Sequence, residues 1–310
     1  MHRATTPQVP VDEGLDGRLR AAMFAHLNTL TGGDPDKALP SSLINTFIFE
    51  GRTIPLIVQT GIWKPAILDA ALTIRTTYTP PNQVPPYVDE IGEDGFPRYK
   101  YRGHDPNHSD NRAMRTAMER HLPIAYFLAS DRGIYLPIYP VWLRAEDRAR
   151  EEFTVALDAS LSLVDASELS PVQRQYVERM TRTRLHQRLF HARVLHAYAD
   201  RCAMCRLHHP ELLDAAHIIP DTEPDGLPVV PNGLSLCKIH HAAYDANLIG
   251  VRPDLVIDVK RRLLDEIDGP MLRHGLQEMD KLRLLVPAQR MSQPDPKRLA
   301  TRYERFLAAS

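Results

Sequence analysis

The chain has 310 residues, of which 43% are hydrophobic, so it is long and apolar enough for two domains that each bury a core. Its formal net charge of -1 excludes a uniformly basic surface, and any polyanionic partner must therefore meet local basic patches. No apolar run reaches the roughly 18 residues of a membrane span and no secretory signal is visible, which predicts a cytoplasmic protein that does not bind membranes.

The first half of the chain predicts a tail followed by a mainly β domain. The amino terminus to about Leu15 is expected to be loose, within a tail bounded at 1–20, and "GRLRAAMFAHLNTLTGG" predicts a short helix that ends at its glycines. From Leu43 to about Val155, short β-branched and aromatic runs alternate with turn residues, which predicts a β domain over 21–160. Within it, "IAYFLAS" and "GIYLPIYPVWL" predict a hairpin, and "SDNRAMRTAMERH" predicts a helix capped by Ser109 or Asp110. An α+β fold with an amino-terminal β-barrel is the expected architecture.

Residues 161–195 predict a basic linker, and its helix is expected to begin at Ser170 and Pro171. Its arginines either contact DNA phosphates or form an ordinary solvated face, and the sequence leaves both readings open. The arginines of this run are Arg174, Arg179, Arg182, Arg184, Arg188 and Arg193, of which Arg182, Arg184 and Arg188 are the predicted phosphate contacts. Residues 261–310 predict a helical extension without recognisable chemistry.

All three cysteines of the chain lie in two short motifs with the spacing of zinc knuckles. Cys202 and Cys205 are three apart, and Cys237 and His240 repeat that spacing further along the chain. Three thiolates and one imidazole are ligands that suit a tetrahedral zinc ion, with His208 or His209 as alternatives to His240. Because such a set leaves no open position, the predicted Zn²⁺ is structural and any reaction must be carried by other residues.

A second group of polar residues surrounds the second knuckle. His241 and Asp245 are four residues apart, so on a helix they share a face and can hold one divalent cation. Upstream, "LLDAAHII" predicts a strand that carries Asp214 and His217, and "NGLSLC" predicts a loop that leads into the helix.

Together, "AAHIIP", "NGLSLC" and "CKIHHAAYD" resemble the HNH nuclease motif, a ββα-metal finger, over roughly 201–251. The resemblance implies DNA phosphodiester hydrolysis by a domain that we bound at 196–260, with a catalytic Mg²⁺ or Mn²⁺. It implies that His217 is the general base, that Asn232 steadies it, and that His241 and Asp245 belong to the catalytic and metal-binding set. Many members have a further metal ligand directly before the base, where this chain has Ala216, and Asp214 is the expected substitute.

The chemistry of hydrolysis supports these roles independently of the resemblance. An imidazole with a pKa near neutrality can take a proton from water, and a partly filled cation shell can neutralise charge on the phosphate. Asn232 precedes a glycine, which is also ordinary turn chemistry, so its role is structural in either reading.

The β domain contains "PPYVDEIGEDGFPRYKYRG", whose order of aromatic, acidic and glycine residues is similar to SRA domains. The resemblance implies an SRA/PUA-like domain that flips a modified cytosine between Tyr87 and Tyr101, with Asp89 or Glu90 reading its edge. Aromatic stacking can offset the lost base stacking. Arg102 departs from the small hydroxyl residue usual after the second tyrosine. The further pocket candidates are Tyr99, Trp63 and Asp110, although strand tyrosines most often belong to a core.

A reader domain joined to a nuclease resembles the modification-dependent, type IV-like restriction endonucleases. The expected substrate is double-stranded DNA with 5-methylcytosine or 5-hydroxymethylcytosine, and cutting both strands with one site per chain favours a homodimer. The alternatives are an HNH nuclease that ignores modification and a zinc-stabilised DNA-binding protein without catalysis.

Overall fold

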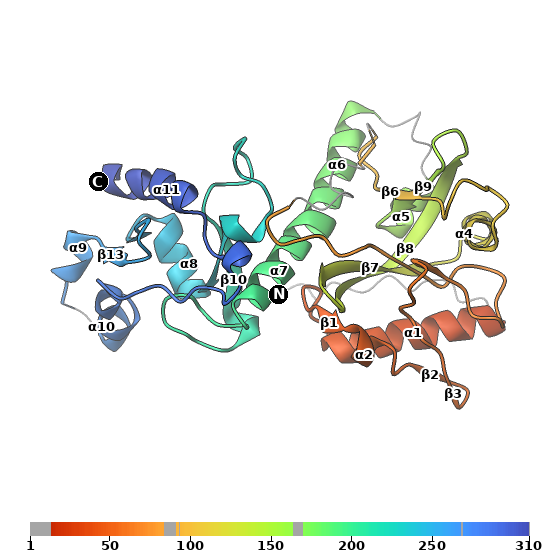
Figure 1. Cartoon of the computed structure of the whole chain (residues 1–310), viewed down its shortest axis with the longest axis horizontal. Helices are drawn as coiled ribbons and strands as arrows, with labels where there is room; N and C mark the ends of the chain where they lie inside the picture. Colours follow the sequence, from red (N-terminus) through yellow and green to blue (C-terminus); the bar gives the residue numbers. More distant parts are fainter. Residues whose placement is uncertain (1–13, 84–90, 93, 164–169, 268, 310) are drawn as a thin grey trace. The chain divides into compact units, whose positions relative to one another are not determined.

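The computed structural model describes the chain except for residues 1–13, 84–90, 93, 164–169, 268 and 310, and describes only the backbone of 182–184. The chain divides into a first unit of Met1–Thr77 and Asp89–Arg184 and a second unit of Tyr78–Val88 and Leu185–Ser310. Each unit has its own helices and strands, so we describe them separately (Figure 1). The expected tail falls mostly outside the described residues.

The first unit is a mixed α+β structure in which one sheet carries most of the strands. The sheet runs in the order β4-β5-β7-β8-β9-β6, with β1 also paired to β8. It curls because the long strand β8 pairs with β7 along its first half and with β9 along its second half, with register shifts in both pairings. The elements are α1 (Leu15–Thr31), β1 (Leu39–Pro40), α2 (Ser41–Ile44), β2 (Ile48–Phe49), β3 (Arg52–Thr53), β4 (Ile62–Trp63), β5 (Thr73–Arg75), β6 (Arg98–Lys100), α4 (Ser109–Glu119), β7 (Ile124–Asp131), β8 (Ile134–Asp147), β9 (Glu152–Ala156), α5 (Ala159–Ser162) and α6 (Pro171–Thr181).

Local signals in the first unit predicted its elements well. The predicted hairpin is confirmed as the antiparallel pair β7 and β8, which turns at Gly133 with φ of 72°. The predicted first helix is confirmed as α1, which ends at Gly32 with φ of 67°. The predicted cap of α4 was wrong, because His108 is the N-cap and its Nδ1 accepts a hydrogen bond of 3.2 Å from the Asp110 backbone.

In the described residues after Ser170, the basic linker forms α6, the π-helical stretch η2 (Arg182–Gln187) and α7 (Arg188–Ala197). As predicted, α6 begins after Ser170, whose backbone N–H donates to the Gln173 side chain at 2.8 Å. In the second unit, Arg193 of α7 is buried and donates to the backbone carbonyls of Thr79 and Pro80. This arginine therefore stabilises the fold of its unit and is not a phosphate contact.

The second unit is built around a two-stranded hairpin followed by a helix. Strand β10 pairs with β11 from Leu213 opposite Cys237 to His217 opposite Gly233, and α8 begins directly after Cys237. The remaining elements are η3 (Pro210–Leu212), β10 (Leu213–His217), η4 (Val230–Asn232), β11 (Gly233–Cys237), α8 (Lys238–Asp245), β12 (Ile249–Val251), β13 (Ile257–Val259), α9 (Arg261–Leu264), α10 (Pro270–Gly275), η5 (Gln277–Met279), η6 (Arg290–Ser292) and α11 (Pro296–Ala308).

The prediction that "NGLSLC" forms a loop was wrong, because Gly233–Cys237 is a fully buried strand. Leu234 and Leu236 are completely buried in the core of the second unit, which also contains Phe190 and Val194 of α7. A Cβ at Gly233 would lie 2.4 Å from Val194 and 2.9 Å from Phe190. Glycine at this position therefore lets α7 pack directly on the hairpin.

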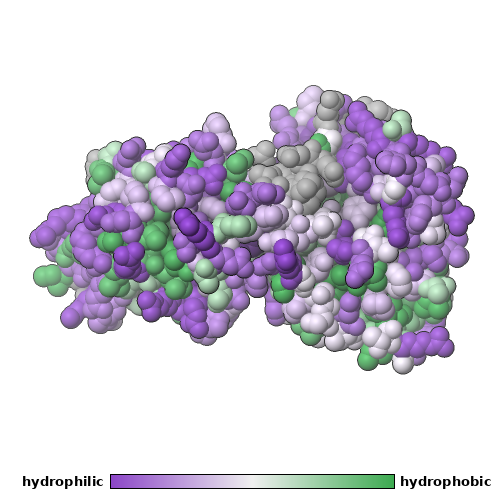
Figure 2. All heavy atoms as spheres, in the orientation of Figure 1, coloured by the Kyte–Doolittle hydropathy of each residue, from purple (hydrophilic) through white to green (hydrophobic). Residues whose placement is uncertain are grey.

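Figure 2 shows one face of the molecule, coloured by the hydropathy of each residue. Hydrophilic residues cover most of the face shown in Figure 2, and hydrophobic residues lie among them in small groups. In the part of the chain that the structure describes, none of the helices is both long and apolar enough to cross a membrane.

Candidate functional site

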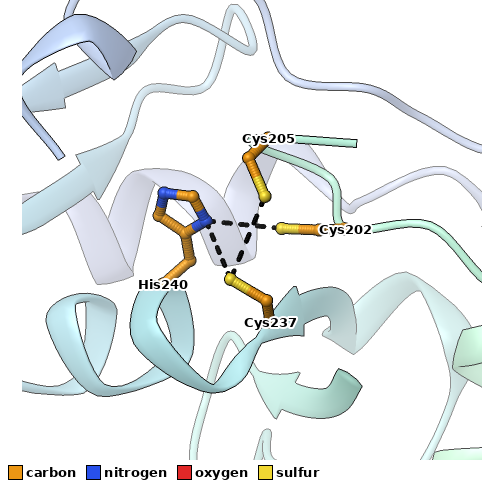
Figure 3. A group of neighbouring side chains, drawn as sticks. All are labelled: Cys202, Cys205, Cys237 and His240. Carbon is orange, nitrogen blue, oxygen red and sulfur yellow. Dashed lines mark hydrogen bonds between the residues drawn. The ribbon is translucent and has the colours of Figure 1, made fainter. Parts of the chain in front are cut away.

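Three cysteines and one histidine converge at the carboxyl end of β11 (Figure 3). Among the described residues, Cys202, Cys205, Cys237 and His240 are the group whose potential metal-binding atoms all lie within 4.8 Å of one another. Cys202 and Cys205 come from the turn after α7, and a backbone hydrogen bond of 2.7 Å from Ala203 to Ser235 attaches this turn to β11. Two knuckles that are distant in sequence thus meet at one point.

The spacing of these atoms suits a zinc ion. The sulfurs of Cys205 and Cys237 are 3.9 Å apart, and Nδ1 of His240 lies 3.2 Å from Cys237 and 3.5 Å from Cys202. With Zn–S bonds of about 2.3 Å and Zn–N bonds of about 2.0 Å, tetrahedral geometry places sulfurs about 3.8 Å apart and sulfur about 3.5 Å from nitrogen. The cluster can therefore bind a metal such as zinc.

A hydrogen bond from the second ring nitrogen of His240 fixes the tautomer that can bind a metal. Nε2 lies 2.7 Å from the carbonyl oxygen of Gly275 at the end of α10, and a carbonyl only accepts. Nε2 therefore carries the proton, and the lone pair of Nδ1 faces the sulfurs. Of the alternatives, His209 instead contacts Glu211 at 3.4 Å, and neither it nor His208 belongs to the cluster.

Crowding of the thiols favours a cation at their centre. Hydrogen bonds with Cys205 and Cys237 lower the pKa of Cys202, whereas contacts with the other two thiols raise the pKa of Cys205. The first thiolate to form thus opposes ionisation of its neighbour, and a divalent cation relieves that repulsion.

His217, at the end of β10, is half-buried and held in a fixed orientation. Its ring stacks on Phe190 of α7, with centroids 4.0 Å apart and planes at 15°. The pKa of His217 lies below its usual value, mainly because burial disfavours the charged ring. His241 lowers this pKa further, while the charges of Asp221 and Asp245 partly oppose the shift. His217 is therefore mostly neutral near pH 7, the state that a general base requires.

Asn232 is completely buried and holds the loop that follows His217. Its side-chain oxygen accepts from the Ile219 backbone at 2.9 Å, and its nitrogen donates to the carbonyls of Ile219 at 2.9 Å and Leu227 at 3.1 Å. The amide thus satisfies three backbone groups and connects the two ends of the loop.

The helix α8 presents His241 next to two carboxylates. Nε2 of His241 lies 3.3 Å from Asp245 and Nδ1 lies 3.3 Å from Asp214, so the two acids contact opposite nitrogens of one ring. Lys238 also donates to Asp214. Burial would raise the pKa of Asp214, but Lys238 and His241 outweigh it and hold this pKa below its usual value.

One pocket brings the catalytic candidates of the strand and the helix together. It has a volume of about 440 Å³, and its walls include His217, His241 and Asp245. Asp214 and Asn232 are not among the residues that line it, and Ala216 is fully buried in the core. The other lining residues, none of them predicted, are Pro220, Asp221, Asn247, Arg302 and Arg305.

The unpredicted residues carried little sequence signal. Asp221 and Asn247 lie close in sequence to predicted site residues, so proximity alone was the available hint. Arg302 and Arg305 come from α11, and only folding brings this distant helix to the pocket.

The candidates for a modified-base pocket are only partly described. Tyr87, Asp89 and Glu90 lie outside the described residues. Tyr101 is 8% exposed, packs on Phe153 with ring centroids 5.2 Å apart, and donates to Glu146. These are contacts of a core side chain.

The remaining candidates of the first unit differ in their surroundings. The hydroxyl of Tyr99 donates to the Arg75 carbonyl at 3.0 Å, and the exposed Arg102 pairs with Asp110 at 2.5 Å. Trp63 has a buried indole N–H that finds no acceptor among the described residues.

Of the three arginines predicted to contact DNA phosphates, the structure describes the side chain of one. The side chains of Arg182 and Arg184 lie outside the described residues, and Arg188 is half-buried in the first turn of α7. Their contact with DNA stays a prediction.

Comparison with known proteins identifies the domain that contains the pocket. Residues 202–252 match the HNH endonuclease family. No curated protein matches the chain. Among solved structures, the chain is similar to the modification-dependent TagI restriction endonuclease, at 15% identity and a TM-score of 0.28, over 80% of this chain and 85% of that chain. The HNH domain makes the chain a DNA endonuclease.

Proposed function

We propose that the chain is a modification-dependent restriction endonuclease that flips a modified cytosine with the segment that resembles SRA domains and hydrolyses DNA phosphodiester bonds with its second unit. The observation that carries the nuclease half is the pocket shared by His217, His241 and Asp245. It brings the imidazole of His217 and the neighbouring side chains of His241 and Asp245 to one cavity, from a strand and a helix.

In this proposal His217 accepts a proton from the attacking water, while Phe190 and the Asn232-held loop fix its ring and backbone. His241 and Asp245 would hold a Mg²⁺ or Mn²⁺ ion. Nε2 and the Asp245 oxygen are 3.3 Å apart, close to the roughly 3 Å between neighbouring ligands of an octahedral ion with bonds of about 2.1 Å. The ion supplies positive charge for the phosphate and the leaving oxygen.

The contacts support a positioning role for Asp214 in place of the metal ligation expected from the sequence. Its carboxylate lies on the Nδ1 side of His241 and outside the pocket wall. A carboxylate there fixes the tautomer that leaves Nε2 available for the ion, and Lys238 holds the carboxylate in place.

The Cys3His cluster is proposed to bind structural Zn²⁺, because its four donors complete a tetrahedral shell and leave no position for substrate. Cutting both strands of duplex DNA with one pocket per chain favours a homodimer.

The reader half of the proposal rests on the sequence likeness of the Tyr87 and Tyr101 segment to SRA domains. Tyr87 and one of Asp89 or Glu90 are the proposed base contacts.

The test compares cleavage of matched duplexes that contain cytosine, 5-methylcytosine or 5-hydroxymethylcytosine, with Mg²⁺ or Mn²⁺. We expect a modified duplex to be cut at least about tenfold faster, a difference of about 1.4 kcal/mol, which lies within the roughly 1–3 kcal/mol that stacking of one base on an aromatic ring contributes. Tyr87→Ala should abolish that preference, whereas Tyr176→Ala, on the exposed face of α6, should preserve it. Equal cutting of all duplexes would reject modification dependence, and binding without cutting would reject the nuclease half.

A further inference from the structure

The carboxyl-terminal helix α11 reaches the catalytic pocket although it lies well beyond the residues that match the HNH family. Its residues Arg302 and Arg305 are the two arginines of the pocket wall, which also contains two carboxylates and two imidazoles. A phosphodiester is an anion, so these cations are the groups to examine for substrate binding.

The helix is fixed to α8 and to the hairpin of β12 and β13. A Cβ at Gly250 would come within 2.5 Å of the Phe306 ring, so α11 packs directly on β12. Tyr303 donates to the buried Asp258 of β13, and Asp295 caps the first turn of the helix. The position of α11 relative to the pocket is thus set by packing at several points.

Arg302 has a structural role in this attachment. It is 8% exposed, its guanidinium lies 4.4 Å from the centre of the Tyr244 ring, and it donates to Asn247 and to the Tyr244 carbonyl. These contacts occupy the guanidinium and hold α11 on the last turn of α8, the helix that carries His241 and Asp245.

Arg305, one turn further along α11, is placed differently. Its side chain is 39% exposed, and its two terminal nitrogens each donate to Glu223 at 2.7 Å. Glu223 lies in the loop between His217 and Asn232, so the pair connects α11 to the loop that follows the proposed base. An ion pair this exposed contributes little to the free energy of unfolding. Its main effect is therefore to hold the Arg305 side chain in place.

We propose that Arg305 binds a phosphate of the DNA strand in the catalytic pocket and that Glu223 positions it for this contact. The ion pair uses two of the five N–H donors of the guanidinium, so three remain for phosphate oxygens. This inference rests on the proposed function, and it adds a substrate contact from outside the HNH domain.

The first test measures DNA binding by the full-length protein in a His217→Ala background, which separates binding from cleavage. Binding is measured at several salt concentrations, and Arg305→Ala should lower the slope of log K against log salt by about 0.9, the value of one phosphate contact. Lys297→Ala is the matched control, since Lys297 is an exposed cation of the same helix and does not line the pocket. It should leave the slope unchanged.

The second test measures cleavage of modified duplex DNA by the otherwise wild-type protein. Arg305→Ala should reduce kcat/KM at least tenfold, Arg305→Lys should restore part of the loss, and Glu223→Gln should have a smaller effect of the same sign. If the parent protein cuts DNA while Arg305→Ala keeps both its kcat/KM and its salt slope, the inference is wrong and the proposed function stands. If the parent does not cut, the proposed function fails and the salt slope still decides whether Arg305 contacts phosphate.

Discussion

His240 and His241 are adjacent in the sequence, yet each belongs to a different site. His240 is buried in a set of four donors, with its second nitrogen bound to the Gly275 carbonyl. His241 faces a pocket of about 440 Å³ and shares its ring between Asp214 and Asp245. Both occur on α8, where neighbouring side chains point about 100° apart because the helix has 3.6 residues per turn.

The comparison shows what separates a structural metal site from a catalytic one. In the proposed function, the Cys3His cluster gives its metal a full set of protein ligands, whereas His241 and Asp245 would provide two ligands and leave positions for water and phosphate. In this proposal, one short helix carries a residue of the structural site and, next to it, a residue of the catalytic site. Substitutions at the two sites should therefore have distinct effects.

The largest expected effect is that of Cys202→Ala. Loss of a zinc ligand should unfold the second unit and abolish cleavage, because structural zinc supplies much of the folding free energy of such domains. Asp245→Ala should abolish cleavage too but leave the fold intact. Zinc content and calorimetric melts of the two full-length variants check the difference, and matching melts would contradict the assignment of separate sites.

The next effect is that of His217→Ala, which should reduce kcat by about 10²- to 10⁴-fold, the usual contribution of a general base. Its melting temperature and zinc content should stay close to those of the wild type, because the imidazole lines the pocket and takes no part in the cysteine cluster. A variant that retains full activity would exclude His217 as the base.

The pH profile sharpens the same prediction. Because the pKa of His217 is lowered, its neutral form persists at acidic pH, and the acid limb of kcat/KM should have its midpoint below about 6.5, the ordinary value for histidine. Asp221→Asn removes a charge that raises this pKa and should move the midpoint further down. A midpoint above 6.5 would point to a different base.

The smallest effect is expected for Asp214→Asn. A carboxylate that orients a metal-binding histidine typically contributes about 10- to 100-fold in metal affinity, less than the loss of the ligand itself. Calorimetric titration of Mn²⁺ into the full-length variant checks this, with Asp245→Asn for comparison. If Asp214→Asn weakens binding as much as Asp245→Asn, then Asp214 is a direct ligand.

Much of this protein was predictable because its chemistry is encoded at short range. Two spacings of three residues identified the cysteine cluster, and one spacing of four residues paired His241 with Asp245. The hairpin of β7 and β8 and the helix α1 followed from turn and cap residues. The helix α4 was predicted correctly, but its cap was not, because a histidine stands where Ser, Thr, Asp or Asn usually caps a helix.

What only the tertiary structure decided are the contacts between distant segments. By sequence, Asp245 was the expected metal ligand and Asp214 the substitute for the position of Ala216, but folding puts the two carboxylates on opposite nitrogens of His241. Arg193 belongs to a run of arginines that suggests DNA, yet it is buried on the Thr79 and Pro80 carbonyls.

The sequence alone determined the residue types and local spacings of both sites, because ligand geometry within one helix or one knuckle depends on a few neighbouring residues. It did not determine that α11 contributes Arg302 and Arg305 to the pocket, nor that Gly275 orients His240. Those contacts join segments tens of residues apart, and they depend on how side chains such as Phe306 pack against Gly250. Packing of that kind is a property of the whole folded unit, which no local pattern records.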